Sequence, residues 1–283
     1  MRRILLYLFV MVFIETVVFY AVSFGWHLFV EGYSMDTALR LFGENSDSPA
    51  VVSLVVATIY TIILLYIFIA RQWCPRPLFQ WRHVKGVVYV AILALVVAFI
   101  LPLMFVEEHT SFLPNLVEAE FDTLLNSPWG YIIICLLAPV LEEVVFRGAV
   151  LQVLSERLSS PILTIVLSAL IFSVLHFNPA QMPSTFLIGL LLAWLFMRTN
   201  SIVPGILYHW VHNSVVFLIS QQIPEEYMDK PLSHFFDNGT LTVLLLVSLA
   251  CMGFLLKTIN VHTQQNIENA ALAEQSAGQK KDA

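Results

Sequence analysis

Charged residues are scarce in this sequence. Asp, Glu, Lys and Arg together make up 12% of its 283 residues, whereas 58% of the residues are hydrophobic. A water-soluble domain carries about twice that share of charged side chains. Apolar runs this dense have to face lipid. The composition therefore excludes an ordinary soluble protein and predicts an all-α fold, a polytopic bundle of membrane helices.

Cysteine is also scarce, and its three positions follow no pattern. Cys74, Cys135 and Cys251 have neither the spacing of a metal site nor that of a disulfide framework. Two of them fall in apolar segments, where cysteine usually packs as a small hydrophobic residue. The sequence thus predicts no cysteine-based chemistry.

The motifs of several intramembrane protease classes are absent. The sequence has no His-Glu-x-x-His of a zinc enzyme, no Gly-x-Gly-Asp of an aspartyl enzyme and no Gly-x-Ser-Gly of a rhomboid-type serine enzyme. No internal repeat is visible either, although transporters often have one. If this chain is a protease, its nucleophile is therefore expected to be water rather than a side chain.

Long apolar runs predict about eight transmembrane helices. The first, which follows Arg2 and Arg3, is longer than the apolar core of a signal peptide and has no cleavage site after it, so it is interpreted as a retained anchor. The fifth, sixth and eighth are shorter than a full span, and the connections after the first and third leave room for short surface helices. The expected helices are Ile4–Phe24, Val51–Ala70, Val87–Val106, Trp129–Leu151, Pro161–Phe177, Ser184–Met197, Ile202–Ser220 and Leu241–Leu256.

The charges of the loops predict the orientation. The Arg71–Lys85 loop is basic, whereas the loops before and after it are acidic. Because basic loops stay on the cytoplasmic side, this loop and both termini are expected in the cytoplasm, and the protein in the cytoplasmic (plasma) membrane. The charges used are Arg71, Arg76, Arg82 and Lys85 against Glu31, Asp36, Glu44, Asp47, Glu107, Glu108, Glu118, Glu120 and Asp122.

Two adjacent carboxylates, Glu142 and Glu143, lie inside the fourth apolar run, and Arg147 follows four residues after the second. Charged groups at membrane depth are costly, so such residues are candidates for function. Successive helical residues point about 100° apart, so the two acids face different ways. Glu143 can pair with Arg147 along the helix, which leaves Glu142 as a candidate proton acceptor. The alternative is that all three residues form a structural polar cluster.

Histidines occur in two later apolar segments. His176 follows Phe172 by one helical turn, and His209 shares a helix face with Asn213, with His212 one position round from that face. A histidine and an amide presented together can hold a water or polarise a carbonyl oxygen. As alternatives, His176 could only bond a neighbouring helix, and His212 could lie near the membrane interface.

The expected depths of these residues agree only in part. At 1.5 Å per residue, Glu142 lies roughly 20 Å below the outer end of its helix and His209 roughly 11 Å above the inner end of its own. His176 would lie roughly 22 Å from the inner end, which is too far outward. The fifth helix must therefore begin deeper than Pro161, be tilted, or be short.

Taken in order, the three motifs resemble the signature of a known family. Glu-Glu-x-x-x-Arg, Phe-x-x-x-His and His-x-x-x-Asn, each on its own apolar segment, are similar to the motifs of the CAAX-processing and bacteriocin-processing family (CPBP, or Abi) of intramembrane endopeptidases. All three match without substitution. The resemblance covers about 129–220 and defines three regions: 1–128 with three helices, 129–220 as a catalytic core of four helices, and 221–283 with the last helix and a polar cytoplasmic tail.

The resemblance implies a role for each motif residue. Glu142 corresponds to the general base, His176 to the first catalytic histidine, and His209 and Asn213 to the second histidine and the asparagine. Glu143 and Arg147 fill the supporting positions of the first motif. From the residues alone, Phe172 is expected to pack and His212 to support the site.

The activity implied by the resemblance is hydrolysis of a peptide bond by water activated between the acid and the histidines. The family is often labelled metalloprotease, and Glu142, His176 and His209 could in principle hold zinc with an open position. Its similarity to a metal-free, glutamate-dependent mechanism favours no catalytic metal. The expected partners are membrane lipid and a membrane-associated peptide or protein substrate, with no nucleic acid.

Two other functions compete with proteolysis. A non-proteolytic immunity or scaffolding protein of the same fold would be expected to lose one of the motif residues, and here all are intact. A transporter could use Glu142 and the histidines as a proton relay, but the repeated halves common in transporters are not visible. Intramembrane proteolysis is therefore the favoured function.

Overall fold

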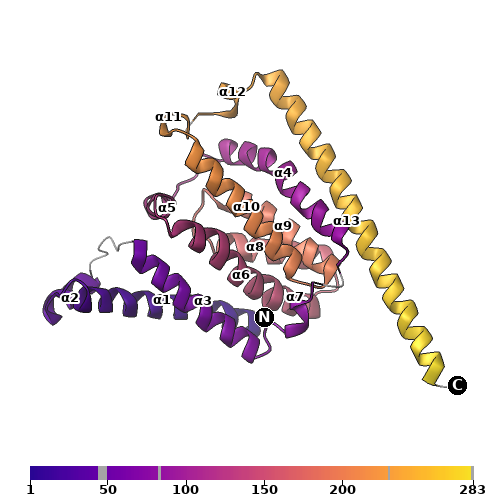
Figure 1. The fold of residues 1–283 in the computed structure, drawn as a ribbon, viewed down its shortest axis with the longest axis horizontal. Coiled ribbons are helices and arrows are strands. Elements are labelled where there is room, and N and C mark those ends of the chain that lie inside the picture. The colour runs from indigo at the N-terminus through magenta and orange to yellow at the C-terminus, as the bar shows by residue number, and fades with distance from the viewer. Residues whose placement is uncertain (44–49, 82–83, 229, 282–283) are drawn as a thin grey trace. The chain divides into compact units, whose positions relative to one another are not determined.

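The fold is described from a computed structural model, which covers residues 1–43, 50–81, 84–228 and 230–281 (Figure 1). These residues form helices joined by turns and loops, and no strand occurs among them, as the composition predicts. They divide into two compact units. Unit 1 contains Met1–Arg76, Val117–Ser168 and Asn213–Gln222, and unit 2 contains Pro77–Leu116, Ala169–His212 and Ile223–Ala283. Glu44, Asp47 and Arg82, whose charges contribute to the predicted orientation, lie outside the described residues.

The first part of unit 1 is a pair of long apolar helices. Helix α1 (Arg2–Phe29) packs along α3 (Ala50–Ala70). The short helix α2 (Met35–Gly43) lies between them in the sequence and contacts α1. Val18, Val52 and Val56 form the buried centre of the pair. Both helices are uniformly apolar, so lipid can cover the faces that they do not bury against each other.

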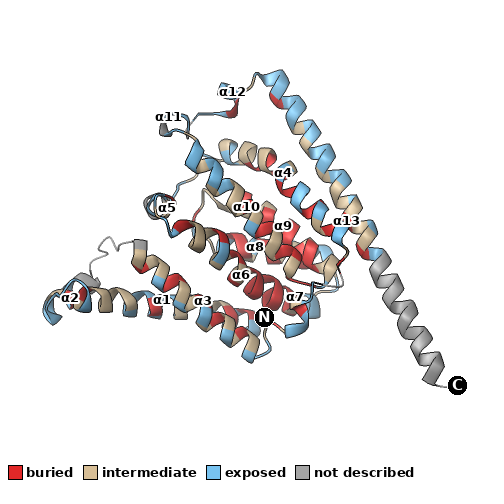
Figure 2. Cartoon of the chain, in the orientation of Figure 1, coloured by how far each residue is buried: buried red, intermediate tan, exposed pale blue. Residues whose placement is uncertain are grey.

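The rest of unit 1 is built around one long helical run with π-type turns. Its segments are η2 (Tyr131–Leu137), α6 (Ala138–Glu142), η3 (Glu143–Val150) and α7 (Leu151–Arg157). Segments η2 and η3 are π-helical. This geometry is rare in proteins, and where it occurs it is frequently at a functional site. Every residue of η3 is buried, and Figure 2 shows this stretch in red. Helix α5 (Glu118–Leu125) precedes the run.

A close contact fixes the position of η3 within unit 1. A Cβ atom at Gly148 would overlap the side chain of Cys74, which follows α3. A larger residue at Gly148 would therefore push this loop away from η3, and this position requires glycine for its small size. Burial raises the pKa of the Cys74 thiol to about 12, so this cysteine stays protonated and is not a nucleophile.

Unit 2 contains α4 (Gly86–His109), α9 (Met182–Thr199) and α13 (Asn238–Lys281), which contact one another. The short segments η1 (Arg76–Phe79), α11 (Glu225–Met228) and α12 (Leu232–Phe235) lie in its connections. Gly189 lets α9 approach within van der Waals contact of Ala169 and Phe172. Helices α8 (Pro161–Val174) and α10 (Val203–Gln222) each begin in one unit and end in the other.

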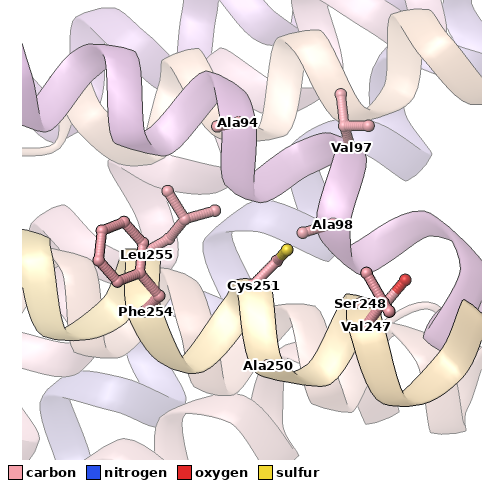
Figure 3. Close-up of a pocket in the computed structure, with 9 residues that line it drawn as sticks. All are labelled: Ala94, Val97, Ala98, Val247, Ser248, Ala250, Cys251, Phe254 and Leu255. Carbon is pink, nitrogen blue, oxygen red and sulfur yellow. The ribbon is translucent and has the colours of Figure 1, made fainter.

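An apolar hollow of about 640 Å³ lies between α4 and α13 (Figure 3). Its walls are mostly small or aliphatic side chains such as Ala94, Ala98 and Leu255, and the Cys251 thiol points into it. Several lining residues, including Val97 and Phe254, are highly exposed, so the hollow opens on a face suited to lipid.

The eight expected segments are all helical, and α2 and α5 are the short helices expected in the two long connections. By length and composition, five helices among the described residues could cross a membrane: Arg2–Phe29, Val51–Ala70, Gly86–His109, Met182–Thr199 and Asn238–Gln264. The other three expected segments are not among these five, and each has a physical reason. The fourth is divided by π-type turns, α8 has only 14 residues, and α10 carries polar side chains.

Candidate active site

The candidate residues divide between the two units. Glu142, Glu143, Arg147 and Asn213 belong to unit 1, whereas Phe172 and the three histidines belong to unit 2. The structure thus brings the acid cluster and the amide into one unit, and in the other unit it places two of the histidines, His176 and His209, against Phe172.

The acid cluster has the geometry that its spacing predicts. Arg147 Nη1 lies 2.8 Å from Glu143 Oε1, and both side chains are completely buried. Glu142, at the junction of α6 and η3, is only partly buried. The pairing neutralises two buried charges. Glu142 as a residue is partly exposed, but the Oε2 atom of its carboxylate is buried.

Asn213 is tied to the same unit. Its Nδ2 donates a hydrogen bond to the carbonyl oxygen of Ile134 in η2, at 3.0 Å. The next residue, Ser214, is 3.1 Å from the Tyr131 hydroxyl. An amide nitrogen carries two hydrogens, so Asn213 can donate the second one to another acceptor. The bond to η2 orients the amide without using its full donor capacity.

In unit 2, Phe172 lies between two histidine rings. Its ring centroid is 4.8 Å from that of His176 and 6.1 Å from that of His209, with interplanar angles of 81° and 79°. These edge-to-face contacts are favourable for aromatic rings and restrict how the two imidazoles can turn. The same aromatic side chain therefore contacts both histidine rings.

The sequence predicted that His176 lies within the fifth helix. In the structure it lies in the turn after that helix. Helix α8 begins at Pro161, as expected, and ends at Val174, three residues before the expected Phe177. His176 Nδ1 lies 2.8 Å from the carbonyl oxygen of Phe172. When Nδ1 donates to that oxygen, Nε2 carries the free lone pair and can accept a proton or a hydrogen bond from water. A metal-binding histidine would have the same arrangement.

The turn that carries His176 is fixed by buried hydrogen bonds, which the sequence did not reveal. Ser173 Oγ donates to the carbonyl oxygen of Met182 at 2.6 Å. Asn178, completely buried, accepts from the Leu116 N–H at 3.0 Å and donates to Asn115 Oδ1 at 2.9 Å. These bonds hold the chain on both sides of His176.

His212 is buried and its ring stacks on Tyr208, with centroids 5.8 Å apart and an interplanar angle of 6°. Within either unit, no three His, Cys, Asp or Glu side chains of the described residues are grouped as ligands for a metal ion.

One comparison found a match for the segment that carries these residues. Residues 124–215 match the family model described as type II CAAX prenyl endopeptidase Rce1-like. This match covers the run from α5 to the middle of α10 and includes all three motifs. No curated protein and no solved structure matches the chain.

Proposed function

We propose, from the premise that residues 124–215 form a type II CAAX prenyl endopeptidase Rce1-like domain, that this integral membrane protein cleaves a membrane-associated peptide or protein near its C-terminus. The observation that carries the proposal is the acid cluster of this domain. Its charges are neutralised by the buried Glu143–Arg147 pair, and Glu142 remains partly exposed beside them. A purely structural ion pair would have no need for the third carboxylate that Glu142 adds beside it.

In the proposed reaction, the Glu142 carboxylate takes a proton from water, and the resulting hydroxide attacks the carbonyl carbon of the scissile bond. The resemblance, and not the arrangement of the two units, supplies the other roles in this proposal: His176 orients the water, and His209 and Asn213 stabilise the negative charge on the carbonyl oxygen. The proton held by Glu142 then passes to the leaving amine as the carbon–nitrogen bond breaks, so no side chain becomes covalently attached. We propose no catalytic metal for this sequence of steps.

A Glu142→Gln variant tests the proposal. Glutamine keeps the size and hydrogen bonding of glutamate but cannot accept a proton at neutral pH, so cleavage should be abolished while the protein remains inserted and folded. The assay uses purified protein in detergent and a fluorogenic farnesylated peptide that ends in a CAAX sequence, with the unprenylated peptide for comparison.

Glu156→Gln is a matched control, because Glu156 is an exposed carboxylate at the end of the same helical run and its variant should cleave like the wild type. Cleavage by Glu142→Gln at the wild-type rate would remove Glu142 as the base. A folded wild-type protein that cleaves neither peptide would favour the non-proteolytic alternative.

A further inference from the structure

Two connections of opposite charge flank α4. The basic connection, residues 71–85, carries four Lys or Arg side chains and no acid, whereas the acidic connection, residues 107–130, carries five acids and no Lys or Arg. Helix α4 has 24 residues and is about 36 Å long at its rise per residue, more than the thickness of a bilayer core. The two connections therefore lie on opposite sides of the membrane, and their charges predict the acidic one on the extracytoplasmic side.

In unit 1, the basic connection covers one end of the helical run that carries Glu142. Cys74 belongs to this connection, is completely buried and packs against Gly148, six residues after Glu142. The Cys74 N–H donates to the carbonyl oxygen of Phe68 at 3.0 Å, so the chain turns directly after α3 and places Cys74 there. Every residue of η3 is buried. Protein therefore surrounds the run on the side of Glu142 that leads to the basic connection.

On the other side of Glu142 the run is partly exposed. Of the seven residues of η2, Cys135 alone is buried. Helix α10 shows a matching contrast, because its buried residues all lie in 203–212, whereas residues 213–222 are intermediate or exposed. Residues 213–222 belong to unit 1, as η2 does. Within this unit, exposure thus increases from Glu142 toward the acidic connection.

Polar side chains follow this exposed half of unit 1. Asn213 donates to the backbone of η2, and the Ser214 hydroxyl lies 3.1 Å from the Tyr131 hydroxyl. Two turns later, Gln221 Nε2 donates to the carbonyl oxygen of Leu125, in the acidic connection, at 2.7 Å. The side chains of Asn213, Ser214, Tyr131 and Gln221 form a polar seam, about 12 Å long from Asn213 to Gln221. Polar residues at membrane depth are costly and typically line a path for water or substrate.

Unit 2, taken by itself, has the same polarity. Ser201 is completely buried, and its Oγ lies 3.1 and 2.8 Å from the carbonyl oxygens of Leu78 and Gln80 in the basic connection. Helix α9, about 27 Å long, separates this contact from the turn of His176. That turn bonds to the acidic connection through Asn178, and His176 is partly exposed. In this unit also, the basic connection makes the buried contact and the candidate residue lies toward the acidic one.

We propose that the substrate reaches Glu142 from the side of the acidic connection, and that it is a membrane-anchored peptide or protein whose cleaved segment lies on the extracytoplasmic side. This inference rests on the proposed function and adds the side from which the substrate comes. The basic connection separates Glu142 from the cytoplasm. The polar seam admits water and offers partners to the N–H and C=O groups of the substrate backbone, which need them inside a membrane.

Thiol labelling tests the path without relying on activity. In a Cys251→Ser background the remaining cysteines are buried, so an introduced thiol is the accessible one. Ser214→Cys places a thiol on the polar seam, and Ser155→Cys, at an exposed position beyond η3, is the matched control. A charged, membrane-impermeant thiol reagent should label Ser214→Cys in right-side-out vesicles and not in inverted ones, and Ser155→Cys only in inverted ones. Labelling of Ser214→Cys only in inverted vesicles, or from neither side, would overturn the path.

Cleavage in sealed vesicles tests the substrate. The probe is the farnesylated CAAX peptide with a charged fluorophore, added outside, and vesicles with the Glu142→Gln protein give the blank for other proteases. Right-side-out vesicles should cleave it, and inverted vesicles should reach the same rate only after detergent opens them. Cleavage by intact inverted vesicles, alone or at an equal rate, would overturn this inference and leave the protease assignment intact. Wild-type protein that cleaves nothing even in detergent would instead contradict the proposed function itself.

Discussion

Arg147 is one of the largest completely buried side chains of the described residues, and Glu143 is its ion-pair partner at 2.8 Å. We expect Arg147→Ala to lower the folded yield and the activity together. The substitution leaves the Glu143 carboxylate buried without its cation, at a penalty of about 3–5 kcal/mol. Thermal unfolding in detergent measures the loss, and Arg157→Ala is a matched control because Arg157 is exposed at the end of α7.

A normal unfolding temperature for Arg147→Ala would show that the pair does not stabilise this region. In that case other groups would have to neutralise the charge of the Glu143 carboxylate.

Treatment with a chelator tests whether Glu142, His176 and His209 act as base and orienting groups or as metal ligands. We expect purified enzyme to keep its activity after exhaustive treatment with a chelator, and metal analysis to find well below one equivalent. Zinc held by these residues would supply a Lewis acid that activates the water, so its removal would abolish activity. Loss on chelation and recovery with stoichiometric zinc would change the roles of the three residues from base and orienting groups to ligands.

At the scale of elements, the turn after α8 determines the position of His176. We expect Asn178→Ala to lower both the unfolding temperature and kcat/KM, because it leaves the Leu116 N–H without its acceptor at about 1–3 kcal/mol and loosens the chain two residues after His176. Asn126→Ala is the matched control, since this exposed amide bonds only to the carbonyl oxygen of Asp122 at the end of α5. A drop in stability with unchanged kcat/KM would show that the turn does not position His176.

The boundaries of helices could be predicted where the length of an apolar run decides them. They could not be predicted where local hydrogen bonding decides them. The expected Val51–Ala70 and Val87–Val106 differ from α3 and α4 by a few residues at most. The π-type turns of η2 and η3 and the end of α8 at Val174 leave no mark in an apolar pattern, because they change which carbonyl accepts each N–H and not which residues are apolar.

At the scale of the whole molecule, the orientation in the membrane is a prediction. Reporter fusions after Glu44 and after Gln80 should report opposite sides, outside and inside respectively, because the loop that contains Gln80 is basic and the loop that contains Glu44 is acidic. Fusions before Arg2 and after Lys257 should both report the inside. The same side for Glu44 and Gln80 would mean that α3 does not cross the membrane.

The sequence by itself determined the all-α membrane fold, the positions of the long helices and the three motifs, since these depend on apolar length and on residue type at fixed spacing. It also predicted the Glu143–Arg147 pair, because residues four apart on a helix are neighbours. Only the tertiary structure decided that Asn178 bonds to Leu116 and Asn115 beside the turn of His176, and that Phe172 contacts His209. Each of these joins segments distant in the chain, and no local periodicity encodes which faces of two helices meet.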